Sequence, residues 1–334
     1  MSDEYAGLTV RLAHSDKTFA TIRHVSLLES GLSAGIPLPY GCANGSCGDC
    51  KARIVSGQVS KIRFHDHPIT ESEKLSGICL LCSYAAQTDL VVEVPEVFSV
   101  DNIPFQQTRG KLCHLEQHHD MWIARFKLTR GSALRYVPGQ YARVTFPDQQ
   151  PCNLAIANCP CESSFIEFHI PITSHLPLDG LRRRDRVLID GPLGHFTMSE
   201  FRKSAGDTGS GIQKPVLFIA LGAGFSAIKP MVEHVLSLEG TPCTLVWIAS
   251  PTVRHYQHNL CRSWADAFDQ FVYIPLSGEK AFAQSISDNQ LPDLISSEIY
   301  FSGDHNPTMN SRDTVINAGA NPEFITLDTI NSKG

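Results

Sequence analysis

Five cysteines between positions 42 and 82 have the spacing of metal ligands. Cys42, Cys47 and Cys50 follow the pattern Cys-x4-Cys-x2-Cys, and Cys79 and Cys82 form a separate Cys-x2-Cys pair. Three cysteines in the Cys-x4-Cys-x2-Cys pattern, together with one distant cysteine, form a known ligand set of [2Fe–2S] clusters. The other cysteines, of 11 in the chain, are scattered. This stretch therefore predicts a metal centre, and the loop spacing favours iron–sulfur chemistry.

The loop that carries the first three cysteines is rich in glycine. It must turn tightly around a cluster, and Gly41, Gly45 and Gly48 give its backbone that freedom. Backbone N–H groups can then point at the sulfur atoms and raise the reduction potential. Two alternatives stay open from the residues alone: a group of buried thiols without metal, and a zinc ion held by four cysteines, which usually come as two Cys-x2-Cys pairs. Either Cys79 or Cys82 could be the distant ligand.

The chain divides into three stretches with different hydrophobic patterns. Together they must position the cysteine loop and any other functional residues. The first reads as a compact α+β domain, the second as an antiparallel β-barrel, and the third as an α/β domain with a parallel sheet. Expected in the first are strands 8–12, 51–54 and 90–94 and a helix 25–34. Expected in the second are strands 122–128, 142–146, 165–170 and 186–189. Expected in the third are strands 216–221, 244–248, 271–274 and 299–302 and helices 227–238, 259–268 and 308–318.

The composition narrows the function classes. The 334 residues include 28 Lys and Arg against 34 Asp and Glu, a net charge of −6, so a nucleic-acid partner is not expected. The longest apolar run, residues 216–221, is far shorter than the ~20 residues that span a bilayer, so membrane insertion is not expected. The first residues lack the features of a secretory signal. We therefore expect a cytoplasmic protein with reduced cysteines.

Several sequence motifs resemble known families. Residues 8–97 resemble the plant-type ferredoxin domain, with Gly-Ile-Pro-Leu-Pro-Tyr-Gly-Cys at 35–42 and Leu-Leu-Cys at 80–82. Residues 108–334 resemble the ferredoxin-NADP reductase module, with Tyr-Val-Pro-Gly-Gln-Tyr at 136–141, Gly-Pro-Leu-Gly-His-Phe at 191–196 and Leu-Gly-Ala-Gly at 221–224. The whole chain is similar to one-chain NADH-dependent reductases of bacterial oxygenases and of CDP-6-deoxy-3,4-glucoseen reduction.

The resemblance implies a fold and an electron path. The fold would be a β-grasp ferredoxin domain at 1–98, an FAD-binding-type β-barrel at 105–203 and an NAD(P)-binding-type Rossmann-like α/β domain at 212–334. The chain would be an NAD(P)H-dependent enzyme, in which a nicotinamide reduces FAD and the flavin passes single electrons to the [2Fe–2S] cluster and on to a partner such as an oxygenase component. The cluster ligands implied are Cys42, Cys47, Cys50 and Cys82, with Cys79 as a packed thiol.

The positions that would hold flavin and nicotinamide are implied in the same way. Where the family has Arg-x-Tyr-Ser, this chain has Cys-Asn-Leu-Ala at 152–155, so the flavin-contacting side chains differ. An alternative therefore stands beside the reductase: a [2Fe–2S] electron carrier or docking protein whose reductase module has lost FAD or NAD(P)H binding. The cofactor-facing residues implied are Asn153, Leu154, Ala155, His169 and Ile170 on the barrel, and Gly222, Gly224, Ser302 and Gly303 on the α/β domain.

Overall fold

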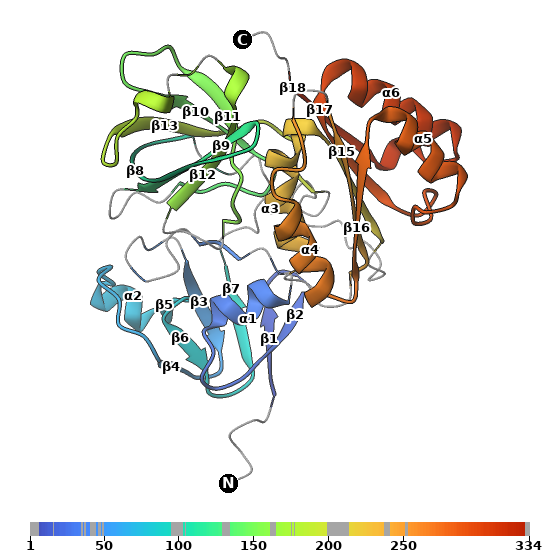
Figure 1. Cartoon of the computed structure of the whole chain (residues 1–334). Helices are drawn as coiled ribbons and strands as arrows, with labels where there is room; N and C mark the ends of the chain where they lie inside the picture. The colour runs from blue at the N-terminus through green and yellow to red at the C-terminus, as the bar shows by residue number, and fades with distance from the viewer. Residues whose placement is uncertain are drawn as a thin grey trace.

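The computed structural model contains three bodies, each built around its own sheet (Figure 1). It describes residues 7–15, 17–34, 36, 38–40, 45, 48, 50–94, 103, 105–128, 134–160, 165–174, 176, 178–198, 214–236, 241–250 and 253–330. The stretch Ser-Ala-Gly-Asp-Thr-Gly-Ser-Gly at 204–211, whose composition is typical of a linker or loop, lies outside the described residues. Within the described part of the chain, no helix is long and apolar enough to cross a membrane.

The N-terminal body is an α+β domain with a five-stranded sheet of order β2-β1-β7-β3-β5. Alternate residues of β1 point into the core, where Val10 and Leu12 are almost completely buried. A two-stranded sheet, β4-β6, stands beside the main sheet. The elements are β1 (Leu8–Leu12), β2 (Thr18–Thr21), α1 (Leu27–Ser33), β3 (Lys51–Ser56), β4 (Val59–Lys61), α2 (Glu71–Leu75), β5 (Ile78–Leu80), β6 (Tyr84–Ala86) and β7 (Leu90–Glu93).

The middle body is a six-stranded antiparallel sheet of order β11-β10-β13-β8-β9-β12, curled into a nearly closed barrel. A bridge between Ile156 and Phe168 joins the end of β11 to β12, the strand at the other edge. Closure of this kind removes the exposed sheet edge. The strands are β8 (Gln106–His118), β9 (Met121–Leu128), β10 (Tyr141–Thr145), β11 (Cys152–Ala155), β12 (Phe165–Pro171) and β13 (Arg186–Leu193).

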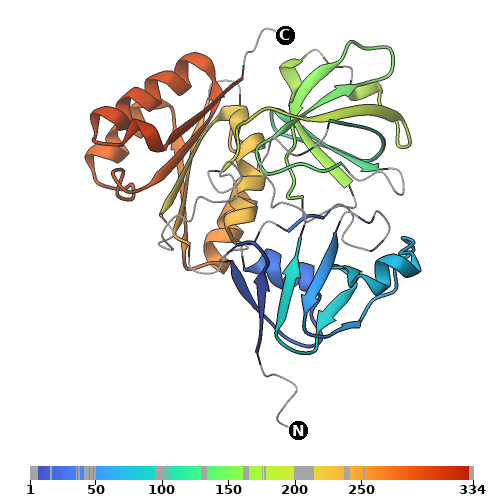
Figure 2. The same cartoon turned by 180° about the vertical axis from the view of Figure 1, so that it is seen from behind.

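The C-terminal body is an α/β domain with a parallel sheet of order β16-β15-β14-β17-β18. All six residues of β14 are buried because helices cover both faces of the sheet. Helices α3 and α4 lie on one face and α5 and α6 on the other (Figures 1 and 2). The elements are β14 (Val216–Leu221), α3 (Phe225–Leu236), β15 (Cys243–Ala249), α4 (His258–Ala267), β16 (Phe271–Ser277), α5 (Glu279–Ser287), β17 (Glu298–Asp304), α6 (His305–Asn317) and β18 (Ile325–Ile330).

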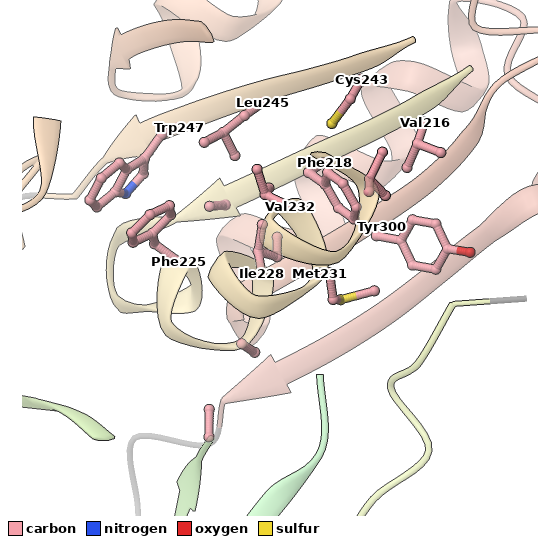
Figure 3. Packing of buried hydrophobic residues seen from close by; sticks show 14 of the residues in the cluster. Val216, Phe218, Phe225, Ile228, Met231, Val232, Cys243, Leu245, Trp247 and Tyr300 are labelled. Atoms are coloured by element: carbon pink, nitrogen blue, oxygen red, sulfur yellow. The ribbon is translucent and has the colours of Figure 1, made fainter. Parts of the chain in front are cut away.

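The barrel and the α/β domain share one hydrophobic core. Met121 and Phe196 of the barrel pack in the same buried cluster as Phe218 of β14 and Met231 of α3. Figure 3 shows this cluster from the side of the parallel sheet, with α3 lying across β14. The fold expected from the sequence, a ferredoxin-type α+β domain followed by an antiparallel barrel and a Rossmann-like α/β domain, is confirmed. The expectation of reduced cysteines is wrong at Cys159, which is disulfide-bonded.

The turn after β14 depends on a glycine with no room for a side chain. A Cβ added at Gly224 would lie 1.9 Å from the carbonyl oxygen of Ser302, a backbone atom that cannot move aside. We expect Gly224→Ala to lower the free energy of unfolding by about 3 kcal/mol, measured by urea denaturation. Gly180→Ala is the matched control, because nothing lies within 4 Å of its Cβ position. Equal stability of the two variants would contradict this packing.

Candidate functional site

Two of the predicted metal ligands meet inside the ferredoxin domain. Cys50 directly precedes β3 and Cys82 follows β5, and these strands pair antiparallel, with Lys51 opposite Leu80. The Cys50 and Cys82 sulfur atoms are 3.3 Å apart, and each residue is only 1% exposed. Neither is disulfide-bonded. Two buried thiols in contact form a soft donor pair suited to iron–sulfur clusters and to zinc. Cys42 and Cys47 lie outside the described residues.

Cys79 occupies a different position from Cys82. It lies within β5, opposite Ala52 of β3, and is 3% exposed. Burial, with a smaller contribution from the charge of Cys82, raises the pKa of the Cys79 thiol to about 12. Cys79 therefore remains a protonated strand residue at neutral pH, while Cys82 is the member of the pair that touches Cys50.

Two glycines of the cysteine loop are described, and both have the conformation expected of them. Gly45 has a φ of +86° and Gly48 a φ of +83°. A Cβ at Gly48 would lie 2.3 Å from Cε1 of the His67 ring, and one at Gly45 would lie 2.5 Å from Cβ of His65. Glycine is thus needed for the turn and also because a histidine-bearing segment packs directly against the loop.

The predicted flavin-facing residues on β11 supply no positive charge, aromatic ring or hydroxyl. Asn153 is exposed, Leu154 is half-buried and Ala155 is 6% exposed. Ala155 pairs with Tyr141 of β10. A guanidinium is the usual bidentate partner of a pyrophosphate. These three side chains do not fit that task, so a flavin bound here would be held by backbone groups and by residues other than these.

His169 and Ile170 of β12 are both buried, in different surroundings. Ile170 lies in the hydrophobic core of the barrel. Both ring nitrogens of His169 have partners: Nε2 is 2.9 Å from Oε1 of Glu167, and Nδ1 is 2.9 Å from the hydroxyl of Tyr256 in the α/β domain. Burial lowers the pKa of His169 against the opposing effect of Glu167. A neutral imidazole that donates to the carboxylate and accepts from Tyr256 satisfies all three groups.

Glu167 is the centre of a buried ionic network between the barrel and α3. It accepts a hydrogen bond from Arg125, and its Oε1 is 3.2 Å from the ammonium of Lys229. Lys229 also donates to the carbonyl of Ala157 at 2.9 Å and is 2.8 Å from Glu233. Burial acts to raise the pKa of Glu167, but His169, Lys229 and Arg125 together hold it well below its ordinary value. The network therefore ties β12 to α3 with charged groups on both sides.

The predicted nucleotide turn lies at the carboxyl ends of the parallel strands. Gly222 and Gly224 form a short 3-10 turn that runs into the N-terminus of α3. The indole of Trp247 donates to the carbonyl of Gly222 at 3.1 Å and stacks on Phe225, with ring centroids 3.9 Å apart (Figure 3). A helix N-terminus after a glycine turn can hold a phosphate. The turn itself fits that task through backbone groups.

Ser302 and Gly303 end the neighbouring strand β17, close to the barrel. The Ser302 hydroxyl donates to Asp328 of β18 at 2.7 Å, and the Tyr141 hydroxyl of β10 donates to the same carboxylate oxygen at 2.5 Å. Burial raises the pKa of Asp328, although both hydrogen bonds oppose that effect. The structure thus brings β10, whose Tyr141 pairs with Ala155 of β11, to the strand end that carries Ser302.

Sequence reasoning named His169 but missed Glu167, Lys229 and Tyr256, which lie around it at this interface. Glu167 and His169 are two residues apart on a strand whose other face, Ile166 and Phe168, fills the barrel core. Side chains alternate between the faces of a strand, so this pattern indicated a polar outer face on β12. Nothing in the sequence indicated that Lys229 would meet it.

The comparisons with known proteins agree with this arrangement. A family model described as 2Fe-2S iron-sulfur cluster binding domain matches residues 10–87. The chain is 24% identical over 326 residues to CDP-6-deoxy-L-threo-D-glycero-4-hexulose-3-dehydrase reductase of Yersinia pseudotuberculosis, covering 93% of this chain and 95% of that protein. It is 25% identical to reductase component 1 of terephthalate 1,2-dioxygenase of Comamonas, covering 79% and 77% of the two chains.

Solved structures share the whole architecture. The Amycolatopsis cytochrome P450 reductase GcoB has a TM-score of 0.58 at 18% identity, covering 96% of this chain and 98% of that one. The ferredoxin reductase in carbazole 1,9a-dioxygenase has a TM-score of 0.55 at 21% identity, covering 97% and 99%. The first domain thus matches a [2Fe–2S] cluster-binding model, and the three domains together have the fold of these solved structures. The chain is similar along nearly its whole length to one-chain reductases that carry a ferredoxin domain.

The buried network predicts a large effect from one neutral substitution. Glu167→Gln keeps the shape but removes the charge that balances Lys229 and Arg125, so we expect urea unfolding to show a loss of about 3 kcal/mol. The folded state depresses the pKa of Glu167, so this stabilisation is present above its ordinary pKa of 4.5 and is lost as the pH falls below it. The difference in the free energy of unfolding between wild type and variant should therefore shrink at acid pH. Glu116→Gln, on the barrel surface, is the control and should be neutral; equal losses in both variants would refute the assignment.

Proposed function

We propose that this protein is an NAD(P)H-dependent reductase that passes electrons through FAD and a [2Fe–2S] cluster to a partner oxygenase or another acceptor. The observation that carries the proposal is the buried contact between the Cys50 and Cys82 thiols inside a domain that matches the [2Fe–2S] model. The same chain continues into the fold of oxygenase reductases and covers nearly the full length of a reductase relative. We also propose a cytoplasmic location, because seven described cysteines are thiols.

The proposed cluster ligands are Cys42, Cys47, Cys50 and Cys82. The glycine turns at 45 and 48 would let the loop close around a cluster, and the His67 ring packs against Gly48. Contact with Cys50 supports Cys82 as the distant ligand in preference to Cys79, which is held within β5. The proposed domains are residues 1–98, 105–203 and 212–334.

A bound flavin would supply the conversion of two-electron hydride chemistry into single-electron steps, which a [2Fe–2S] cluster could carry. The protein's part is to hold these groups in sequence. We assign the flavin to the barrel strand that carries Asn153, Leu154 and Ala155, with His169 and Ile170 on the strand behind it. The nicotinamide nucleotide is assigned to the turn at Gly222 and Gly224, where the N-terminus of α3 would hold a phosphate, and to the strand end at Ser302 and Gly303.

A second function is favoured by one observation. The β11 side chains offer no group for a flavin pyrophosphate, and the hydroxyls of Tyr141 and Ser302 share Asp328 across the junction of the two domains. If the junction is closed to both cofactors, the chain would act as a [2Fe–2S] electron carrier or docking protein. NAD(P)H would then not reduce its cluster.

One experiment separates the two functions. Anaerobically purified protein should release flavin on acid treatment, and NADH or NADPH should bleach the cluster absorbance within seconds. Protein that contains iron and sulfide but no releasable flavin, and whose spectrum is unchanged by either nucleotide, would refute the reductase and support the carrier. Added FAD distinguishes a lost flavin from an absent site, because it restores reduction only where the site exists.

The ligand assignment predicts opposite results for two similar substitutions. We expect Cys82→Ser to lose the visible and electron paramagnetic resonance spectra of the native cluster, because it removes a sulfur that touches Cys50. Cys79→Ser is the matched control, equally buried and three residues away, and should keep both spectra. Loss of the spectra in Cys79→Ser with retention in Cys82→Ser would reverse the assignment.

A further inference from the structure

A completely buried hydroxyl lies beside the proposed distant ligand. Ser83 directly follows Cys82 and is 0% exposed. Its Oγ is 3.4 Å from the Sγ of Cys82, which is close enough for a hydrogen bond to sulfur. Among the residues that the structure describes, this sulfur is the hydrogen-bond partner of the Ser83 hydroxyl. Because a buried hydroxyl without a partner is costly, the contact with Cys82 is what allows a serine at this position.

The backbone of Ser83 is held in place by hydrogen bonds on both sides. Its N–H donates to the carbonyl of Leu80 at 2.9 Å. Its carbonyl accepts from the N–H groups of Ile62 and Arg63, at 2.9 and 3.2 Å. These bonds fix the main chain from which the hydroxyl projects. The contact with Cys82 therefore belongs to the folded framework of the domain and does not depend on a surface side chain.

The same hydroxyl lies against the cysteine loop. A Cβ added at Gly45 would be 3.1 Å from the Oγ of Ser83. The N–H of His67 donates to the carbonyl of Gly45 at 3.0 Å and so holds this part of the loop. On the other side, the sulfur of Cys82 is 3.3 Å from that of Cys50. The hydroxyl thus lies between the loop and the sulfur pair, where the proposed cluster ligands come together.

The chemical state of Cys82 decides which group donates this hydrogen bond. Between a thiol and a hydroxyl, either atom could be the donor. A cysteine binds a metal as the thiolate, which has no proton to donate. The serine hydroxyl has one O–H and can donate it. With Cys82 as a metal ligand, Ser83 is therefore the donor and the sulfur is the acceptor.

We propose that Ser83 raises the reduction potential of the cluster by donating its hydroxyl hydrogen bond to the Sγ of Cys82. This assignment rests on the proposed function of Cys82 as a cluster ligand. When one electron passes from the flavin to the cluster, the sulfur ligands carry more negative charge. A hydrogen bond to sulfur strengthens as that charge grows, so it stabilises the reduced form more than the oxidised form. Ser83 thus favours the uptake of the electron.

A redox titration of full-length protein with its cluster tests this role. Dithionite is added without oxygen in the presence of redox mediators, and electron paramagnetic resonance measures the reduced cluster. At the wild-type midpoint, we expect Ser83→Ala to lower the ratio of reduced to oxidised cluster about tenfold, a shift of about 59 mV. Water entering the vacated space would stabilise the added charge and shift the potential the opposite way. Ser30→Ala is the matched control and should keep the wild-type potential, because this buried hydroxyl is bonded to Thr21 at 2.7 Å.

A second measurement detects the hydrogen bond itself. Transfer to D2O replaces the hydroxyl proton with deuterium and should shift the iron–sulfur stretching bands of the resonance Raman spectrum. Backbone N–H groups contribute to this shift in every variant, so Ser83→Ala should keep only part of the wild-type shift. Ser30→Ala should keep all of it. Ser83→Thr retains a hydroxyl and should keep both the wild-type potential and the full deuterium shift.

The outcomes separate this proposal from the function on which it rests. Wild-type protein that forms no [2Fe–2S] cluster contradicts the proposed function itself. A cluster that forms in both proteins, with the same potential and deuterium shift in Ser83→Ala as in wild type, overturns only the role of Ser83. If Ser83→Ala assembles no cluster, Ser83→Thr decides: the wild-type potential and deuterium shift support the hydrogen bond, and a lowered potential overturns it.

Discussion

The contact between two buried thiols is the constraint on which the electron path depends. Cys50 precedes the start of β3 and Cys82 follows the end of β5, so both lie at the same end of this antiparallel pair, where the register brings their sulfur atoms to 3.3 Å. Two thiolates without a metal would repel each other in so dry a place, whereas a bound metal centre balances their charge. The loop glycines and the segment at 61–67, whose histidines pack against them, lie around this sulfur pair. The ferredoxin domain is thus organised around this sulfur pair.

The other two domains are joined by burial of both apolar and charged groups. One hydrophobic cluster crosses their junction, and beside it Glu167 balances Arg125 and Lys229. Removal of the carboxylate alone, or of the cations alone, would leave a buried charge without its partner. The network therefore fixes which faces of the barrel and of α3 meet. The same junction contains Ser302 and the β11 strand.

Much of this fold was predictable because local patterns agree with it. The apolar run at 216–221 is the central strand β14, and the Cys-x4-Cys-x2-Cys spacing located the cluster domain, which the family model matches. Strand β8 was missed because its 13 residues are largely polar, although alternate ones are buried in its first half. Helix α5 was missed because only Phe282 and Ser285 of it are buried. The contact of Lys229 with Glu167 joins residues far apart in the chain, and no local pattern encodes it.

The central claim is that this chain binds a [2Fe–2S] cluster through four cysteine sulfurs in its first domain. Its most direct test is elemental analysis of protein purified without oxygen, with iron, acid-labile sulfide and zinc measured on the same sample. We predict about two iron and two sulfide per chain, with zinc at background. Zinc in place of iron, or no metal at all, would contradict the account.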